Sequence, residues 1–283
     1  MFPANLMFRK HNTGRIMSLL HLFILAVIQG ITEFLPVSSS GHLILLPRIT
    51  GLQDQGQIID VAVHIGTLGA VVLYFWADVR KAISGCGHIL RGRFTTEPAK
   101  LALLLIVATI PVVIAGLALK LSGFDDALRS IKVIAWTMLI FGILLYFIDQ
   151  RGGHKKGTPD WNYRDAIKLG LWQMIALLPG TSRSGITITG ARQMGYARED
   201  AARISMLMSI PTIFASGVLL GAEVISTADI QAAKDCAIAA IFAFIAALLA
   251  LSLMMRLLKS VSFTPYVIYR VILGIGLLWF AYT

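Results

Sequence analysis

The chain has 283 residues, of which 57% are hydrophobic and only 14% are charged, and its mean hydropathy is +0.76. This composition excludes an ordinary soluble domain and indicates an all-α protein that crosses a membrane several times. Two cysteines, Cys86 and Cys236, exclude a disulfide framework, and the net charge of +10 does not indicate nucleic-acid binding, because most basic residues lie between apolar segments.

Residues 1–17 form a polar, basic stretch ahead of the first apolar run. No small-residue cleavage site follows that run, so the stretch does not resemble a cleaved signal peptide. We interpret it as an N-terminal extension without fixed structure, and Met17 is an alternative start. A single membrane domain is then expected over residues 18–283.

Residues 19–51 contain two apolar runs that are each too short to span a bilayer, which needs about 20 residues. The first run, Leu19–Leu35, stops before Pro36, because proline has no N–H and disfavours helical geometry in the residue before it. The second run begins near Gly41. We therefore predict a re-entrant helical hairpin that is buried in protein rather than exposed to lipid.

Polar residues gather around this break, within the stretch QGITEFLPVSSSGHLILL. Glu33 and His42 lie at membrane depth, where an ionised side chain costs roughly 2.5–3.5 kcal/mol, so a functional role is expected. One of Ser38, Ser39 and Ser40 is predicted to cap the second short helix, whose free N–H groups favour an anion such as phosphate. The alternative is a polar patch that only packs helices together.

Six longer apolar segments follow the hairpin in two groups of three, and each is long enough to span a membrane. A second interrupted segment separates the two groups. The six predicted spans are residues 58–77, 100–120, 131–149, 202–222, 235–257 and 265–282.

The second interrupted segment covers residues 163–194 and contains LPGTSRSGIT after a short helical run. Its Pro-Gly pair is predicted to end one half-helix, and Thr181 or Ser182 to cap the next. Arg183 then falls in the first turn of that helix, where its planar guanidinium can bind phosphate oxygens in a bidentate manner. The alternative is that Arg183 pairs with Glu33 only to hold the two hairpin tips together, and the two roles are compatible.

The two hairpins align when Leu35–Ser39 is placed on Leu178–Ser182, an offset of 143 residues. Each hairpin is followed by three spans, so the second half of the chain begins on the opposite face of the membrane. We therefore expect an inverted-topology repeat, with one repeat over residues 18–150 and the other over residues 160–283. In such folds the site lies where interrupted helices meet at the midplane.

Basic residues are shared unevenly between the two predicted faces. One face carries most of them, among them Arg80, Lys155 and Arg192. The richer face is expected to be cytoplasmic. The first hairpin would then open to the periplasm or cell exterior, and the second hairpin would enter from the cytoplasm.

Two motifs resemble those of the bacterial undecaprenyl-diphosphate phosphatases of the bacitracin-resistance type. The first runs from Gln29 to His42 as QGITEFLPVSSSGH, and the second runs from Pro179 to Thr187 as PGTSRSGIT. The resemblance extends from about Met17 to the C-terminus. It implies six spans and two re-entrant hairpins in the bacterial inner membrane, and the charge count places the opening of the site at the periplasmic or outer face.

The resemblance also implies hydrolysis of undecaprenyl diphosphate to undecaprenyl phosphate and inorganic phosphate, which recycles the lipid carrier for peptidoglycan synthesis and confers bacitracin resistance. Ser39 is the expected nucleophile, and His42 is expected to take its proton or to protonate a leaving oxygen. Glu33 is expected to orient His42 or to hold a divalent cation, Mg²⁺ or Ca²⁺, and Arg183 to neutralise the phosphates. The expected substrate-binding residues are Gln29, Ser38, Ser40, Thr181, Ser182, Ser184 and Thr187.

One residue departs from the family pattern, because many members carry Glu where this chain has Gln29. Gln29 and Glu33 are four residues apart and share a helix face. Glu33 must therefore act without a second carboxylate from this helix.

Other functions compete with the phosphatase. The same pocket could serve a transporter or flippase for a phosphorylated lipid or anion, or a lipid-binding protein without catalysis. The pairing of Ser39 with His42 favours an enzyme. Within the enzyme interpretation, water could attack the phosphorus directly, and Ser39 would then only bind the substrate. The expected partners are the lipid substrate and the bilayer, without nucleic acid, and a homodimer is one open oligomeric state.

Overall fold

The computed structural model describes residues 18–51, 55–123, 128, 130–153, 155–224 and 230–283. The predicted extension over residues 1–17 lies outside them. The regular elements of the described chain are helices, in the order α1 (Leu19–Phe34), α2 (Ser39–Thr50), α3 (Gly56–Tyr74), α4 (Trp76–Leu90), α5 (Glu97–Ser122), α7 (Ile131–Arg151), η1 (Thr158–Asp160), α8 (Tyr163–Met174), η2 (Ile175–Leu177), α9 (Arg183–Gln193), α10 (Arg198–Val224), α11 (Ile230–Leu257) and α12 (Thr264–Tyr282).

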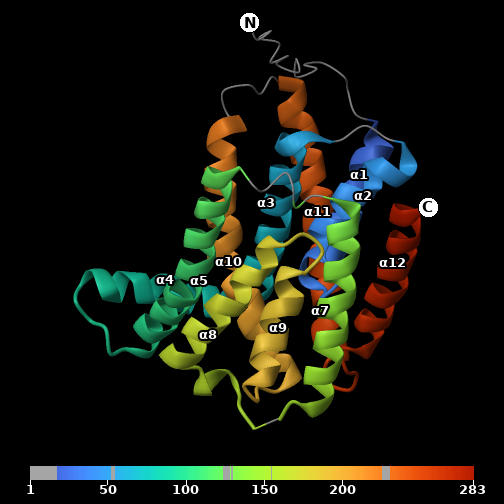
Figure 1. Ribbon diagram of the computed structural model, residues 1–283. Coiled ribbons are helices and arrows are strands. Elements are labelled where there is room, and N and C mark those ends of the chain that lie inside the picture. Colours follow the sequence, from blue (N-terminus) through green and yellow to red (C-terminus); the bar gives the residue numbers. More distant parts are fainter. Residues whose placement is uncertain (1–17, 52–54, 124–127, 129, 154, 225–229) are drawn as a thin grey trace, which may run out of the picture.

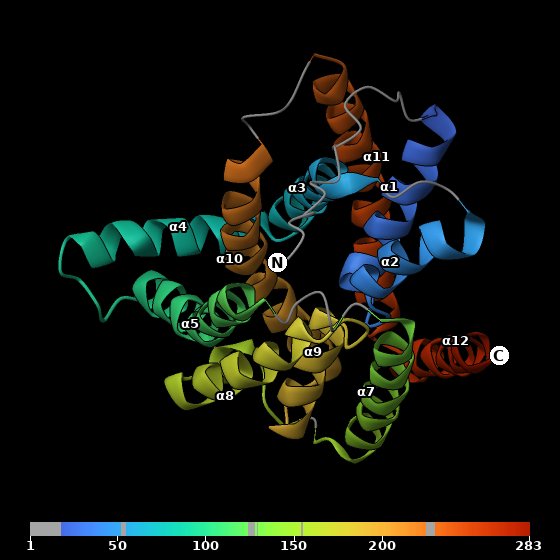
Figure 2. The same ribbon diagram turned by 45° about the horizontal axis from the view of Figure 1, so that its top comes forward.

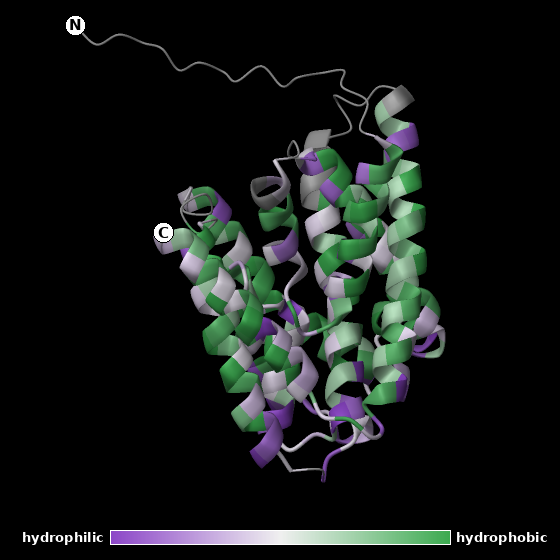
Figure 3. Cartoon of the chain, turned by 90° about the vertical axis from the view of Figure 1, so that its right-hand side faces the viewer, coloured by the Kyte–Doolittle hydropathy of each residue, from purple (hydrophilic) through white to green (hydrophobic). Residues whose placement is uncertain are grey.

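The six predicted spans are confirmed as helices α3, α5, α7, α10, α11 and α12, each long and apolar enough to cross a membrane. Hydrophobic residues fill the middle of these helices, and hydrophilic residues gather mostly toward the ends (Figure 3). Large apolar side chains also face outward, such as Leu249 on α11 and Ile272 on α12. An apolar exterior of this kind suits contact with lipid tails rather than water.

Two short helical pairs enter the bundle from opposite ends (Figure 1). The pair α1–α2 opens at the top of the view, the pair α8–α9 opens at the bottom, and their tips meet in the middle. Helix α1 ends at Phe34, ahead of Pro36 as predicted, whereas α8 is prolonged by the short helix η2. This is the geometry expected of two oppositely directed re-entrant hairpins.

The two halves of the chain pack in a reciprocal pattern. Helix α1 packs on α11, and its counterpart α8 packs on α5, while α3 packs on α10 and α7 on α12. Glycines allow the closest approach, because a Cβ on Gly66 would overlap the carbonyl oxygen of Ala240 on α11. Small residues at helix crossings let backbones approach closely, which drives association of helices in membranes. Each hairpin is thus held by the second span of the other half.

Helix α4 is a feature that the hydropathy pattern does not predict. It runs across the axis of the other helices (Figures 1 and 2). Trp76, Ile83 and Leu90 recur every seven residues and are exposed, while Arg80 and Lys81 are exposed beside them. A helix that exposes both large apolar and basic side chains suits a segment that lies in the membrane interface. Because α4 mixes apolar and polar residues, a search for long apolar runs does not find it.

A buried ion cluster fixes the mouth of the second hairpin. The Nε atom of Arg192 on α9 donates to Oδ1 of Asp149 on α7 over 2.8 Å, and Arg198 Nε donates to the same oxygen over 2.9 Å. The Asp149 carboxylate also accepts from the backbone N–H of Phe263 over 3.3 Å. Arg192 is fully buried. Its charge is therefore neutralised inside the protein, and its predicted place on the cytoplasmic side stays a prediction.

Candidate active site

The two hairpin breaks share an unusual backbone conformation. Ser38 and Ser182 are the N-cap residues of α2 and α9, with φ of 74° and 72° respectively. Their hydroxyls accept hydrogen bonds from the N–H groups of Gly41 and Gly185. Non-glycine residues with positive φ store strain and occur preferentially at functional sites. The capping predictions for both hairpins are confirmed, with one serine selected in each.

The shared cap corrects the predicted alignment of the two hairpins. Ser38 corresponds to Ser182, an offset of 144 residues, whereas the sequence comparison predicts 143. The second loop holds one more residue between its proline and the cap, so the register changes after the proline. As a result, Ser39 and Arg183 occupy the same position, the first residue of α2 and of α9.

Glu33 is the centre to which both hairpins connect. Its Oε2 atom accepts a 2.6 Å hydrogen bond from Ser39 Oγ and a 3.0 Å hydrogen bond from Gln29 Nε2. Its Oε1 atom accepts a 2.7 Å hydrogen bond from Arg183 Nη2. The carboxylate is 8% exposed, so these donors replace water around it. The predicted Glu33–Arg183 pair between the hairpin tips is confirmed.

His64 on α3 is the fourth group beside this carboxylate. Its Nε2 atom lies 3.8 Å from Oε2 of Glu33, and its Nδ1 atom contacts the carbonyl oxygen of Asp60 at 2.6 Å. In the sequence, His64 stands near the start of a predicted span. Glu33 lies 31 residues earlier, so no local sequence pattern indicates that the two side chains meet.

His42 has a different environment from the one that its spacing predicts. Its Nδ1 atom lies 2.7 Å from the carbonyl oxygen of Ser38, and its Nε2 atom lies 2.6 Å from Tyr269 Oη. A carbonyl can only accept, so Nδ1 carries a proton, and in the neutral ring Nε2 accepts from the tyrosine. The Ser39 hydroxyl donates to Glu33 instead. The geometry thus favours Glu33 over His42 as the acceptor of the Ser39 proton.

The other hydroxyls predicted to bind substrate occupy varied positions. Ser184 Oγ donates to the carbonyl oxygen of Leu35 over 3.0 Å and so joins the two tips. Thr187 Oγ1 donates to the Arg183 carbonyl oxygen over 2.8 Å. Thr181 Oγ1 is buried and has no hydrogen-bond partner among the described residues, whereas Ser40 is exposed. Substrate binding by these groups stays a prediction.

Arg270 on α12 holds both breaks through the backbone. It is completely buried. Its Nη1 atom donates to the Pro36 carbonyl oxygen of the first hairpin over 3.3 Å, and its Nη2 atom donates to the Gly180 carbonyl oxygen of the second over 3.1 Å. The remaining donors reach carbonyl oxygens of α7, those of Thr137 and Met138. All four of these hydrogen bonds go to backbone carbonyl oxygens, and no carboxylate pairs with Arg270 among the described residues.

The oxygen atoms around Glu33 suit a hard divalent cation. The described residues hold no cluster of three His, Cys, Asp or Glu side chains that could bind a metal by themselves. However, Oε1 of Gln29 is buried and has no hydrogen-bond partner among the described groups. An amide oxygen beside a carboxylate offers two ligands that Mg²⁺ or Ca²⁺ accepts, with phosphate and water oxygens as the others. The residues present therefore fit such an ion.

Comparison with known proteins gives full-length matches. Residues 22–276 match the family model described as bacitracin resistance protein BacA. A protein of Ruegeria pomeroyi is 70% identical over 267 residues, which cover 94% of this chain and 100% of the relative. A protein of Jannaschia sp. is 68% identical over 266 residues, with the same coverage of both chains. A protein of Saccharophagus degradans is 42% identical over 268 residues, again with 94% and 100% coverage. All three relatives are named undecaprenyl-diphosphatase.

Proposed function

The chain belongs to the bacitracin resistance protein BacA family, and we propose on this basis that it hydrolyses undecaprenyl diphosphate to undecaprenyl phosphate and inorganic phosphate. This reaction returns the lipid carrier to cell-wall synthesis and confers resistance to bacitracin. The observation that carries the proposal is the meeting of Ser39, Glu33 and Arg183 where the two hairpin breaks face each other.

Ser39 is the proposed nucleophile. Its hydroxyl proton passes to Oε2 of Glu33, which already accepts its hydrogen bond over 2.6 Å. The Oγ atom forms a bond with the terminal phosphorus, the bridging P–O bond breaks, and undecaprenyl phosphate leaves. Water then hydrolyses the phosphoserine and releases inorganic phosphate. The positive φ of Ser38 supports this assignment, because the cap directs the start of α2 toward Glu33.

Arg183 is proposed to neutralise the phosphates. Its NH2 atom pairs with Glu33 in the structure, and its guanidinium lies at the first turn of α9, where free N–H groups add positive potential. Phosphoryl transfer depends mostly on positioning and on stabilisation of charge on the phosphate oxygens. Before substrate binds, the pair with Glu33 keeps the Arg183 guanidinium oriented. The substrate phosphates would then compete with Glu33 for this guanidinium.

His42 is proposed to supply a proton to the oxygen that leaves the terminal phosphorus. Its ring is stacked on that of Tyr269, with 5.7 Å between centroids. The tyrosine hydroxyl and the Ser38 carbonyl fix the ring from both nitrogens. In the neutral ring Nε2 accepts from Tyr269, so His42 supplies this proton from its doubly protonated form, in which the Nε2–H turns from the tyrosine to the leaving oxygen.

Gln29 and Glu33 are the proposed ligands of a divalent cation, Mg²⁺ or Ca²⁺. The unpartnered Oε1 atom of Gln29 supports this assignment. When bound, such an ion supplies positive charge that offsets the negative charge of the diphosphate. Gln29 would contribute a neutral ligand, which predicts weaker cation binding than a carboxylate at this position would give.

The protein crosses the membrane several times, and we place it in the bacterial inner membrane with the first hairpin open to the periplasm. The basic residues near the opposite mouth, Lys155, Lys156 and Arg164, support this orientation. The homodimer stays a prediction. A flippase for a phosphorylated lipid is the second candidate function, and the reciprocal packing of α1 on α11 and α8 on α5 favours it.

Release of inorganic phosphate from undecaprenyl diphosphate tests the proposal. The purified full chain in detergent is assayed with and without Mg²⁺ or Ca²⁺, beside Ser39→Ala. Cation-dependent release by the native chain and none by the variant is the expected result. A folded native chain that releases no phosphate would contradict the phosphatase and favour the flippase, which needs the anion site but not the nucleophile.

A further inference from the structure

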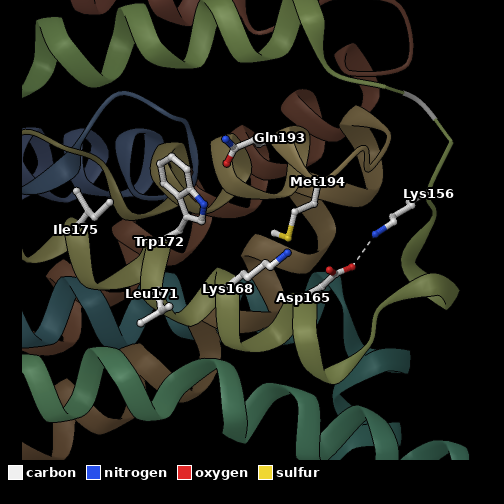
Figure 4. A pocket seen from close by; sticks show the side chains of 8 residues that line it. All are labelled: Lys156, Asp165, Lys168, Leu171, Trp172, Ile175, Gln193 and Met194. Carbon is white, nitrogen blue, oxygen red and sulfur yellow. Dashed lines mark hydrogen bonds and ion pairs between the residues drawn. The ribbon is translucent and has the colours of Figure 1, made fainter.

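A second polar site lies at the mouth of the second hairpin, in a cavity of about 590 Å³ between α8 and α9 (Figure 4). Gln193 lines it at the last residue of α9, whereas Arg183 of the catalytic group is the first residue of that helix. Ten residues of helix separate the two, a distance of about 15 Å. The cavity is therefore distinct from the proposed active site.

One face of α8 forms the wall of this cavity. Lys168, Leu171, Trp172 and Ile175 line it at the spacing i, i+3, i+4 and i+7, which places them on one side of a helix. The lysine lies nearest the mouth, and the apolar side chains follow toward the hairpin tip (Figure 4). The stripe is about 10 Å long, shorter than the roughly 15 Å of hydrocarbon in one leaflet.

The mouth end of the cavity is cationic. Asp165 is already satisfied, since its Oδ2 atom accepts from Lys156 Nζ over 3.0 Å and from Tyr196 Oη over 2.7 Å. Lys168 adds a second positive charge on the next turn of α8 and is exposed. No ion pair of Lys168 within 4 Å is found among the described residues. The amide of Gln193 offers a neutral donor nearby (Figure 4).

The apolar end is open to the surroundings of the bundle. Leu171 is 53% exposed, and Ile167 beside it on the outer face of α8 is 50% exposed. A free phosphate ion gains nothing from such a surface, whereas an acyl chain does, at about 0.8 kcal/mol per buried CH₂ group. A cationic end at the mouth and an apolar end toward the tip together match an amphiphile aligned with one leaflet.

We propose that this cavity binds an anionic phospholipid of the leaflet that surrounds the mouth of the second hairpin. Lys168 and Lys156 contact the phosphate of the headgroup, and one acyl chain lies along Leu171, Trp172 and Ile175. The bound lipid joins α8 to the end of α9. It occupies a site separate from the one that hydrolyses undecaprenyl diphosphate.

Native mass spectrometry of the delipidated full chain tests the proposal. Phosphatidylglycerol and phosphatidylcholine with the same acyl chains are titrated separately, and the retained lipids are counted for the native chain and for Lys168→Glu. Lys155→Glu is the matched control, because it makes the same charge change at the same mouth but does not line the cavity. Thermal unfolding shows that each variant is folded.

The native chain should retain one phosphatidylglycerol about tenfold more tightly than phosphatidylcholine, Lys168→Glu should lose about tenfold in affinity, and Lys155→Glu should lose far less. Equal binding of the two lipids, or equal losses in both variants, would overturn the proposal. Displacement of phosphatidylglycerol by excess inorganic phosphate would assign the site to a free anion instead. If Lys168→Glu does not fold, Lys168→Gln replaces it, with a smaller loss expected.

Discussion

The hydroxyl of Ser39 donates a 2.6 Å hydrogen bond to Oε2 of Glu33, while both nitrogens of His42 are held by other groups. The proposed nucleophile and its proposed proton acceptor thus come from opposite sides of the first hairpin break. From this contact we can rank the losses in phosphate release that substitutions in the site should cause.

Glu33→Gln should lower phosphate release more than His42→Gln. Glutamine keeps the size of Glu33 but cannot take the Ser39 proton, so a loss of about 10³-fold in kcat is expected, against about 10²-fold for His42→Gln. Single-turnover phosphate release measures both. Ser84→Ala, an exposed hydroxyl on α4, is the control. An equal or larger loss for His42→Gln would reassign the base to His42.

Tyr269→Phe should lower the rate without unfolding the protein. The change removes only the hydroxyl that lies 2.6 Å from His42 Nε2 and leaves the stacked ring in place. A loss of about tenfold in kcat, roughly the value of one hydrogen bond, is expected with little change in KM. Tyr266→Phe, on the same helix, is the matched control. A change in KM alone would show that the tyrosine binds substrate instead.

Gln29→Glu should lower the cation concentration that gives half of the maximal rate. The variant places two carboxylates side by side, because Gln29 Nε2 now lies 3.0 Å from Glu33 Oε2. A second charged oxygen ligand should tighten Mg²⁺ or Ca²⁺ binding by about tenfold. Titration of each cation against phosphate release measures this. An unchanged half-maximal concentration would remove Gln29 from the proposed metal site.

Arg270→Lys should destabilise the fold although it conserves the charge. Arg270 donates to four backbone carbonyl oxygens, from both hairpin breaks and from α7. A lysine cannot reach all of them, and each buried group left unpaired costs about 1–3 kcal/mol, so a loss of about 3 kcal/mol or more is expected. Thermal unfolding in detergent measures it. Arg256→Lys, at an exposed position, should unfold like the native chain.

Asp165 should make stability depend on pH. Burial raises the pKa of its carboxyl, but the hydrogen bonds from Tyr196 and Lys156 outweigh burial and hold the pKa below its usual value. Its contribution is therefore present above the unfolded pKa of about 4 and is lost as pH falls through the lower folded pKa. The Tm difference between the native chain and Asp165→Asn should be largest near neutral pH and should shrink below about pH 4. A constant difference would contradict this linkage.

Local chemistry made much of this fold predictable. Proline at each break, hydroxyl residues able to cap the following helix and six long apolar runs are signals that act within a few residues of sequence. They place Ser39 and Arg183 at the starts of short helices and bring the two tips together. The meeting of Glu33 with Arg183 follows from them, since opposite charges at membrane depth are stable only as partners.

Tertiary packing decided what the sequence left open. Contacts of His42 with Tyr269 and of Arg270 with Pro36 join residues 227 and 234 positions apart. No local pattern encodes them, because they depend on how α12 is rotated against the hairpins. The same holds for His64 beside Glu33. Local sequence signals thus specified the six spans and the two hairpin breaks, though not α4, since these features depend on backbone hydrogen bonding and apolar length. Only the packed bundle determined which atom of each polar side chain meets which partner.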